Sequence, residues 1–378
     1  MYRHLYSEFL QRHSGKQHFA SHSHHFWPDV TRQAMLDYWE DSASLTDRKW
    51  SKILGEKVPR TQELIARHLK FSRPADITFA PNTHDFLIRL MSSFSTNKPL
   101  EVLTTDSEFY SFERQMRRWE EVGKVRLTRV PSQPFEDFEQ RFRAALSAKA
   151  WDLVFLSHVF FNSGVAVRNL ETLVEAAPAS SVFVLDAYHS YMALPVDLSK
   201  LGDRVYFLAG GYKYAQSGEG CCFMTLPQVK DRKPEITGWF AELGNLSNFQ
   251  NEVGFADDGT RFAGSTLDYT ALYRMLAVLE LFEREGITVE KIHTHVRRQQ
   301  RYFLEALPQL KSLGLSAEQI LGRPDLEGHG HFLTFELGSA EKVSAISQAL
   351  EKRGLLTDSR KSRLRFGFGL YHEGPYTL

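Results

Sequence analysis

The chain has very little cysteine, since Cys221 and Cys222 are its only two cysteines in 378 residues. Because they are adjacent and lie in an apolar, strand-like run, they exclude a disulfide framework and favour a reducing compartment such as the cytoplasm. An excess of one charge is also missing, because 46 Lys and Arg residues balance 46 Asp and Glu residues. The net charge therefore gives no reason to expect nucleic acid or an anionic membrane as a partner.

Long apolar runs are missing as well. No stretch reaches the length of about 18 apolar residues that a membrane-spanning helix needs, and the N-terminal MYRHLYSEFLQRHSGKQ lacks the apolar core of a signal peptide. We therefore expect a cytoplasmic protein that is neither secreted nor inserted in a membrane. The sequence has no internal repeat, low-complexity tract or coiled-coil heptad, and its 42% of hydrophobic residues can fill one large domain and a smaller one.

The order of the apolar runs predicts an α/β fold. Between about residues 60 and 225, helical or polar sequence separates ITFA, LEVLTT, DLVFLSHV, SVFVLDAYHS, RVYFLAGG and GCCFMTL, which is typical of a mostly parallel sheet covered by helices. Between about 267 and 310, apolar residues at three- and four-residue spacing predict a long helix. The tail then predicts a strand, a helix closed by Gly354 and another strand.

These patterns predict three parts of the chain. Residues 46–280 form a large α/β domain and residues 281–378 form a smaller α+β domain. Residues 1–45 are an N-terminal segment that joins the small domain.

Three polar side chains follow neighbouring predicted strands. Asp186 ends the strand SVFVLD, His189 follows it three residues later, and Lys213 follows the next strand in a glycine-rich turn. Ligands of open α/β sheets bind at such strand ends. Pyridoxal phosphate (PLP) needs an amine for its Schiff base and a carboxylate near its ring nitrogen, which Lys213 and Asp186 can supply. Taken singly, Asp186 could equally cap a turn and His189 could be a core residue.

Two further segments fit the same cofactor. In ITFAPNTHDFLIRL, a helix begins after Asn82 at Thr83, where free backbone N–H groups and a hydroxyl can hold a phosphate, although a plain helix cap explains the pattern as well. In TTDSEFYSFERQ, Phe109 or Tyr110 can stack on a flat ring, and core packing is the alternative for one of them.

These residues lie in an order that resembles the class V aminotransferase superfamily of fold-type I PLP enzymes, and within it the kynureninases. The resemblance rests on D-x-x-H in DAYH, the tyrosine and lysine of YKY, LSHVFFNSG, GWF, RFAGST and LRFGFGLYH, and it covers residues 18 to 373. It implies a homodimer with shared active sites that acts on an amino acid as a small-molecule substrate, without a metal, a nucleic acid or a membrane.

The resemblance also implies roles for single residues. Lys213 would form the Schiff base, with Asp186 and Tyr212 as the other catalytic residues, and Arg365 would bind the α-carboxylate of the substrate through its two-pronged guanidinium. The further cofactor-binding residues would be Asn82, Thr83, Phe109, Ser157, His189, Trp239 and Thr266, of which Trp239 and Thr266 would reach the phosphate of a neighbouring subunit.

The chain departs from the kynureninases where the substrate would bind. Phe160 replaces an asparagine of the strand motif, and RFAGST lacks the proline that usually follows. The N-terminal loop FASHSHHFWP replaces a Gly-Asn-Ser type sequence, and we expect His24 and His25 of this loop to bind substrate and line the entrance. An aromatic or acidic amino acid is the expected substrate.

Several other functions are compatible with parts of the sequence. Hydrolysis of a Cβ–Cγ bond, as in kynureninase, is the preferred reaction, and transamination with an oxo-acid acceptor is the alternative. A cysteine desulfurase needs a nucleophilic cysteine far beyond the lysine, whereas Cys221 and Cys222 follow Lys213 within a strand. HSHH lacks the helical histidine pair and carboxylate of a metal hydrolase. A non-catalytic PLP-binding protein would need neither Lys213 nor Arg365.

Overall fold

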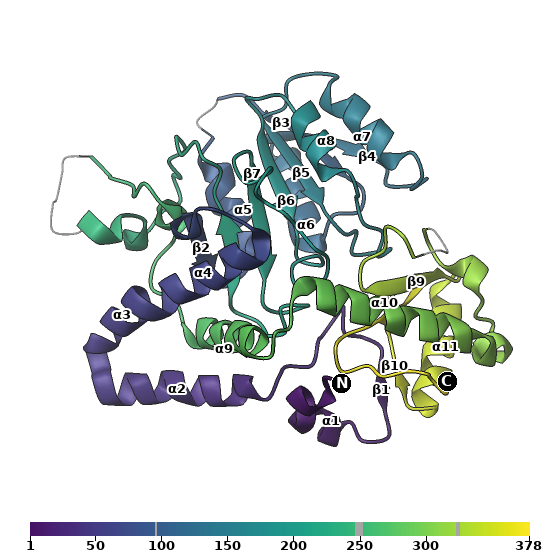
Figure 1. The fold of residues 1–378 in the computed structure, drawn as a ribbon. Coiled ribbons are helices and arrows are strands. Elements are labelled where there is room, and N and C mark those ends of the chain that lie inside the picture. Colours follow the sequence, from purple (N-terminus) through teal and green to yellow (C-terminus); the bar gives the residue numbers. More distant parts are fainter. Residues whose placement is uncertain (95–96, 246–251, 323–325) are drawn as a thin grey trace.

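The computed structural model describes residues 1–94, 97–245, 252–322 and 326–378. A seven-stranded sheet with strand order β2-β8-β7-β6-β5-β3-β4 forms its centre (Figure 1). Neighbouring pairs among β3 to β7 run parallel, and only β8 runs antiparallel to both of its neighbours. The strands are β2 (Ile77–Ala80), β3 (Leu100–Thr105), β4 (Val125–Val130), β5 (Leu153–Ser157), β6 (Val182–Asp186), β7 (Val205–Gly210) and β8 (Cys222–Thr225).

The strands follow the apolar runs because the sheet is buried on both faces. All residues of β2, β7 and β8 are buried, and side chains of alternating direction supply two separate core clusters. The predicted α/β fold with a mostly parallel sheet is thereby confirmed. The helices that accompany the sheet are α2 (Val30–Leu45), α3 (Lys49–Lys52), α4 (Val58–Leu69), α5 (Thr83–Ser92), α6 (Tyr110–Glu121), α7 (Phe138–Leu146), α8 (Leu170–Ala176) and α9 (Thr270–Arg284).

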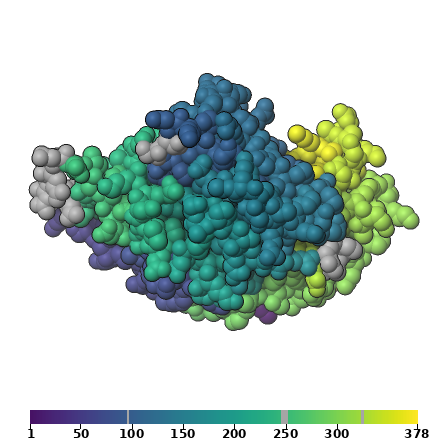
Figure 2. All heavy atoms as spheres, turned by 90° about the horizontal axis from the view of Figure 1, so that it is seen from above, coloured from purple at the N-terminus to yellow at the C-terminus, as the bar shows by residue number. Residues whose placement is uncertain are grey.

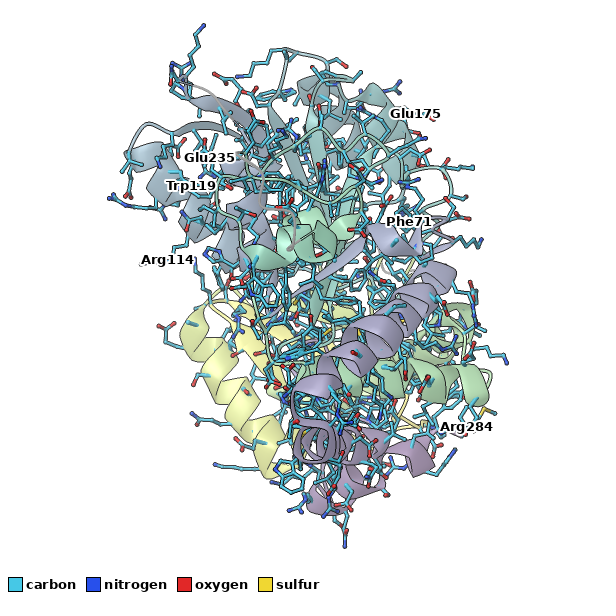
Figure 3. The ribbon with its side chains drawn as sticks, turned by 90° about the vertical axis from the view of Figure 1, so that its left-hand side faces the viewer. Phe71, Arg114, Trp119, Glu175, Glu235 and Arg284 are labelled. Carbon is cyan, nitrogen blue, oxygen red and sulfur yellow. The ribbon has the colours of Figure 1, made fainter. Side chains whose placement is uncertain are left out.

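One strand has no counterpart among the predicted apolar runs. Strand β4 reads VRLTRV and pairs in parallel with β3 at the edge of the sheet. Its middle residues are only partly buried or exposed, because an edge strand has one neighbour and less cover. Helix α6 precedes β4, and its Arg114 projects outward on the side where α11 lies (Figure 3).

The long helix predicted between 267 and 310 is two helices. Helix α9 ends at Arg284, Gly286 adopts a left-handed backbone with φ of +60°, and Thr288 caps α10 (Val289–Ala306) by accepting a hydrogen bond from the Lys291 backbone N–H. Helix α10 then runs beneath the sheet toward the C-terminal part of the chain (Figure 1).

The C-terminal unit, which we define as residues 326–378, contains a three-stranded antiparallel sheet with strand order β11-β12-β9. Its elements are β9 (Phe332–Glu336), α11 (Ala340–Lys352), β10 (Leu355–Leu356), β11 (Asp358–Arg360) and β12 (Arg363–Gly367). At the other end of the chain, α1 (Ser7–Arg12) precedes β1 (Gln17–His18), which pairs in parallel with β10. Phe19 also packs into the core of the C-terminal unit, so the two ends of the sequence lie side by side.

Seen from above, the sheet and its helices form one continuous surface with the C-terminal unit at one end (Figure 2). In the parts of the chain that the structure describes, no helix combines the length and the apolar character needed to cross a membrane.

Candidate active site

The carboxyl ends of β6 and β7 bring Asp186 and Lys213 together. The two strands are parallel neighbours, Asp186 is the last residue of β6, and Lys213 follows the end of β7 by three residues. Lys213 Nζ donates a hydrogen bond to the backbone oxygen of His22 at 3.0 Å. The lysine is therefore held by the N-terminal segment as well as by its own turn.

Burial is the main cause of the shifted pKa values of Lys213 and Asp186. Removal of water around Lys213, together with the positive charge of Arg365, lowers the pKa of its amine to about 7. Burial raises the pKa of Asp186 to about 6, against the opposing effects of the Tyr188 N–H, which donates to Oδ1 at 2.9 Å, and of Lys213. An amine with a pKa near neutrality can exchange its proton and attack a carbonyl, which an ordinary lysine does poorly.

His189 and Tyr212 lie beside the lysine. His189 is buried, its Nδ1 has no hydrogen-bond partner among the described residues, and burial together with the charge of Lys213 keeps its pKa well below the usual value. The Tyr212 ring lies 5.7 Å from Lys213 Nζ, and burial raises the pKa of its hydroxyl. An unpartnered buried ring nitrogen is a polar group that a ligand could satisfy.

Two further predicted groups of cofactor contacts lie at the start of α5 and just before α6. Asn82 caps α5 by accepting a hydrogen bond from the Asp85 N–H at 2.9 Å, and the helix begins at Thr83. The Phe109 ring lies 5.9 Å from Lys213 Nζ, stands edge-on to Phe161 and is 39% exposed. A half-exposed aromatic ring beside the lysine can cover one face of a flat ligand.

Arg365 reaches the site from β12 and is almost completely buried. Its Nη1 donates to the Phe161 backbone oxygen at 2.6 Å and its Nη2 pairs with Asp358, which lies opposite Arg365 across the β11–β12 pair. Arg365 Nε is buried and has no partner among the described residues. The Nε–H group of Arg365 can therefore donate a hydrogen bond to a ligand. Asp358, which the sequence analysis did not single out, is bound to Nη2 of the same guanidinium.

His22 of the histidine-rich loop contacts the site, although the sequence analysis selected only His24 and His25 of this loop. His22 stacks on Phe332, with ring centroids 4.6 Å apart, and its Nε2 lies 3.3 Å from Asp358 Oδ2. Burial lowers its pKa to about 3. No sequence signal distinguishes His22 from its neighbours, because its position depends on how the N-terminal segment packs against β12.

His24 and His25 have different surroundings. His24 is half-buried, stacks on Trp27 and lies edge-on to Tyr212, with centroids 5.7 Å apart. His25 is buried among tyrosine rings, including Tyr214, instead of lining an entrance. Its Nδ1 lies 2.7 Å from the Phe26 backbone oxygen. Only His24 of the two thus lies beside a residue of the predicted site.

Glu108 is a second carboxyl group that the sequence analysis missed. Its Oε1 accepts a hydrogen bond from Thr105 Oγ1 at 2.6 Å and its Oε2 accepts one from Ser157 Oγ. Ser157 is the partner of Asp186 in the β5–β6 register. Burial, together with the charge of Asp186, raises the pKa of Glu108 to about 8, although its hydrogen bonds from Ser157 and Thr105 act in the opposite direction. The sequence did contain a signal for Glu108, because this acidic residue follows the end of β3 and immediately precedes Phe109, a predicted cofactor contact.

Trp239 and Thr266 are both exposed and their segments lie side by side. The Phe240 N–H donates to the Gly264 backbone oxygen at 3.1 Å, and Gly238 lies so close to Gly264 that a Cβ atom at position 238 would not fit.

The two cysteines, in contrast, are buried, and burial raises the pKa of both thiols. Neither thiol has the partial exposure and lowered pKa of a nucleophile.

The aminotransferase class-V family model matches residues 26–357. The chain is 26% identical over 301 residues to the kynureninase of Geobacillus thermodenitrificans, which covers 76% of this chain and 67% of that protein. It is 27% identical to the kynureninase of Pseudomonas fluorescens over 57% of this chain and 51% of the relative, so that match spans about half of the relative's length. Isopenicillin N epimerase of Streptomyces clavuligerus matches at 27% over 45% of this chain and 44% of its own.

Solved structures share the fold at low sequence identity. A C-DES mutant with glycine covalently linked to its PLP cofactor superposes with a TM-score of 0.81 at 18% identity, over 98% of this chain and 96% of the other. Cysteine desulfurase CsdA from Escherichia coli gives 0.77 at 13% identity, over 98% and 94%. The chain therefore belongs to the aminotransferase class-V family, as a kynureninase-like enzyme with pyridoxal 5'-phosphate as its cofactor.

Proposed function

We propose that this enzyme hydrolyses the Cβ–Cγ bond of an amino acid that carries a γ-carbonyl group, as kynureninase does. Addition of one water to that bond yields alanine and the carboxylic acid formed from the γ-carbonyl. The observation that carries the proposal is the meeting of Lys213, Asp186 and the unpartnered Nε of Arg365 in one site of a kynureninase-like chain.

The side chains present fit the cofactor. The buried Nδ1 of His189 lacks a partner among the described residues, and α5 directs its free N–H groups to the end of β2, where a phosphate is stabilised. Asp186 would hold the proton of the ring nitrogen, and Phe109 would cover the ring. When bound, pyridoxal phosphate supplies an aldehyde for the substrate amine and a protonated ring that withdraws electrons from the substrate Cα.

The residues of the chain then have separate tasks toward the substrate. Arg365 would bind the α-carboxylate through Nε and the adjacent Nη2, which it shares with Asp358. This contact fixes Cα close to Lys213, whose amine would remove the Cα proton. The pKa of about 7 leaves a large part of that amine unprotonated at neutral pH, as a base requires.

The test offers the holoenzyme kynurenine, its 3-hydroxy derivative and a panel of amino acids, each with and without an oxo-acid acceptor. Alanine together with an anthranilate-type product, identified by mass, is the expected result. A new amino acid that forms only when the acceptor is present would instead identify a transaminase, with the same cofactor site. Sodium borohydride reduction followed by peptide mapping should place the pyridoxyl group on Lys213, and a label elsewhere would contradict the assignment.

We also propose that the enzyme is a homodimer in which Trp239 and Thr266 reach the phosphate site of the partner subunit. Both side chains are exposed, which supports this assignment. The Trp239 ring is 48% exposed in the single chain, and a partner subunit would cover this apolar surface. Mixing an inactive Lys213→Ala subunit with an inactive Thr266→Ala subunit should restore part of the activity in hybrid dimers. An active monomer in sedimentation would contradict the proposal.

A further inference from the structure

A cavity of about 370 Å³ lies between the large sheet and the C-terminal unit, next to the candidate active site. Glu108 and Phe161 line its inner part, and the hairpin turn between β11 and β12 lines its other side. Glu108 directly precedes Phe109, whose ring is close to Lys213 Nζ. The cavity therefore adjoins the candidate active site through Glu108 and through Phe161, whose backbone oxygen accepts a hydrogen bond from Arg365.

Two arginines on β12 hold the part of the cavity lining that Phe161 and Asn162 form. Arg365 Nη1 donates to the backbone oxygen of Phe161, and Arg363 Nη1 donates to that of Asn162 at 3.0 Å. Asn162 also donates a side-chain hydrogen bond to Ser107 Oγ at 3.1 Å. The turn after β5 is thus held from both sides, and the residue that would bind the α-carboxylate also positions the cavity wall.

The acidic side chains that line the cavity all have partners. Glu108 accepts hydrogen bonds from Thr105 and Ser157, as described above, and Asp106 accepts one from the Ser132 N–H at 2.8 Å. Glu113 pairs with Arg129 at 3.1 Å, and Glu336 pairs with Arg363 at 3.0 Å. Arginines thus compensate the charges of Glu113 and Glu336, whereas Asp106 and Glu108 are held by hydrogen bonds from neutral groups.

Among the residues that the structure describes, Lys361 is the cation of the cavity lining that has no ion-pair partner. Arg363 pairs with Glu336, and Arg360 Nη1 lies 3.4 Å from Asp358 Oδ1. Within the described ranges, Lys361 has neither an ion pair nor a side-chain hydrogen bond. Its ammonium group, which is exposed, therefore has no carboxylate of the described residues within ion-pair distance.

The backbone of Lys361 is also unusual. Arg360 pairs with Arg363, so Lys361 and Ser362 form a two-residue hairpin turn, and Lys361 has φ of +50°. Such turn positions normally carry glycine, asparagine or aspartate, because a lysine side chain is strained there. A strained residue at a site rim is a reason to look for a functional contact.

We propose that this cavity receives the end of the substrate side chain and that Lys361 selects amino acids whose flat side chain ends in an anionic group. The edge of Phe161 and the ring of Tyr110, whose centroids are 5.1 Å apart, provide the wall for the flat part. The inference rests on the proposed function, since it requires an amino acid held between Lys213 and Arg365. It places side-chain recognition between the large sheet and the C-terminal unit, away from the histidine-rich loop.

The test compares two nearly isosteric ligands, 4-carboxy-L-phenylalanine and 4-carbamoyl-L-phenylalanine, which differ in charge at the far end. Their dissociation constants are measured on the holoenzyme by titration of the cofactor absorbance and by calorimetry. We expect the carboxy compound to bind about fivefold more tightly, as for a partly exposed ion pair. Lys361→Asn suits the left-handed backbone and should remove this preference, and Lys361→Glu should reverse it.

Lys342→Met serves as the matched control, because Lys342 is an exposed lysine of α11 outside the cavity. It should keep the fivefold preference, whereas thermal unfolding should show that both Lys361 variants remain folded. Equal binding of the two ligands to the unaltered enzyme, or a preference that survives in Lys361→Asn, would overturn the inference while amino-acid binding itself stood. A cofactor band that responds to no amino acid would overturn the proposed function and this inference with it.

Discussion

Replacement of Arg365 by lysine tests the substrate site while keeping the charge. The guanidinium holds the Phe161 oxygen and Asp358 and still leaves Nε unpartnered, whereas an ammonium group has a single donor atom. Loss of one charge-assisted hydrogen bond to the substrate carboxylate costs about 1.5–3 kcal/mol. Because about 1.4 kcal/mol is a factor of ten, KM should rise roughly 10- to 150-fold in Arg365→Lys, with kcat changed by only about threefold.

The assay is steady-state kinetics with the best substrate of the panel, accompanied by urea unfolding. Arg297→Lys is the matched control, because Arg297 is another arginine that holds a backbone oxygen, that of His329, but lies on α10. Both variants should lose stability through the weakened carbonyl contact, and only Arg365→Lys should raise KM. An unchanged KM in Arg365→Lys, or an equal rise in Arg297→Lys, would refute the assignment of Arg365 to the substrate carboxylate.

Three other predictions follow from the charges of the site and core. Asp186→Asn should retain cofactor but lose roughly 100-fold or more in kcat, because the ring nitrogen loses its charge partner; near-normal turnover would contradict this. Glu108→Gln stays neutral at every pH, so its pH–rate profile should lack the change near pH 8 that ionisation of Glu108 causes in the unaltered enzyme. A profile identical to that of the unaltered enzyme would exclude a role for this ionisation. Finally, urea unfolding of the apoenzyme should show stability falling by several kcal/mol between pH 6.5 and 5. Burial lowers the folded-state pKa of ten histidines, including His22 and His25, so the unfolded chain takes up protons first as the pH falls. The raised pKa values of Glu108 and Asp186 act in the opposite direction but belong to only two groups, and constant stability in this range would contradict the burial argument.

Much of the fold is determined locally, and the sequence predicts it. The runs that form β2, β3, β5, β6, β7 and β8 are apolar because a sheet covered on both faces buries every position. Strand β4 was not predicted, because its edge position tolerates the arginines of VRLTRV. The order of Asp186, His189 and Lys213 along the chain likewise indicated the cofactor, since parallel neighbouring strands bring their carboxyl ends to one edge.

The tertiary structure decided what surrounds these residues. His22 contacts Lys213 from 191 positions away, and Asp358 joins Arg365 only because β11 and β12 pair in a particular register. The same holds for His25, whose burial among tyrosines depends on the packing of the N-terminal segment. The pattern of apolar residues within one helix or strand shows which of its side chains are buried. Contacts between distant segments depend instead on how whole helices and strands pack together. A short stretch of sequence does not determine that packing.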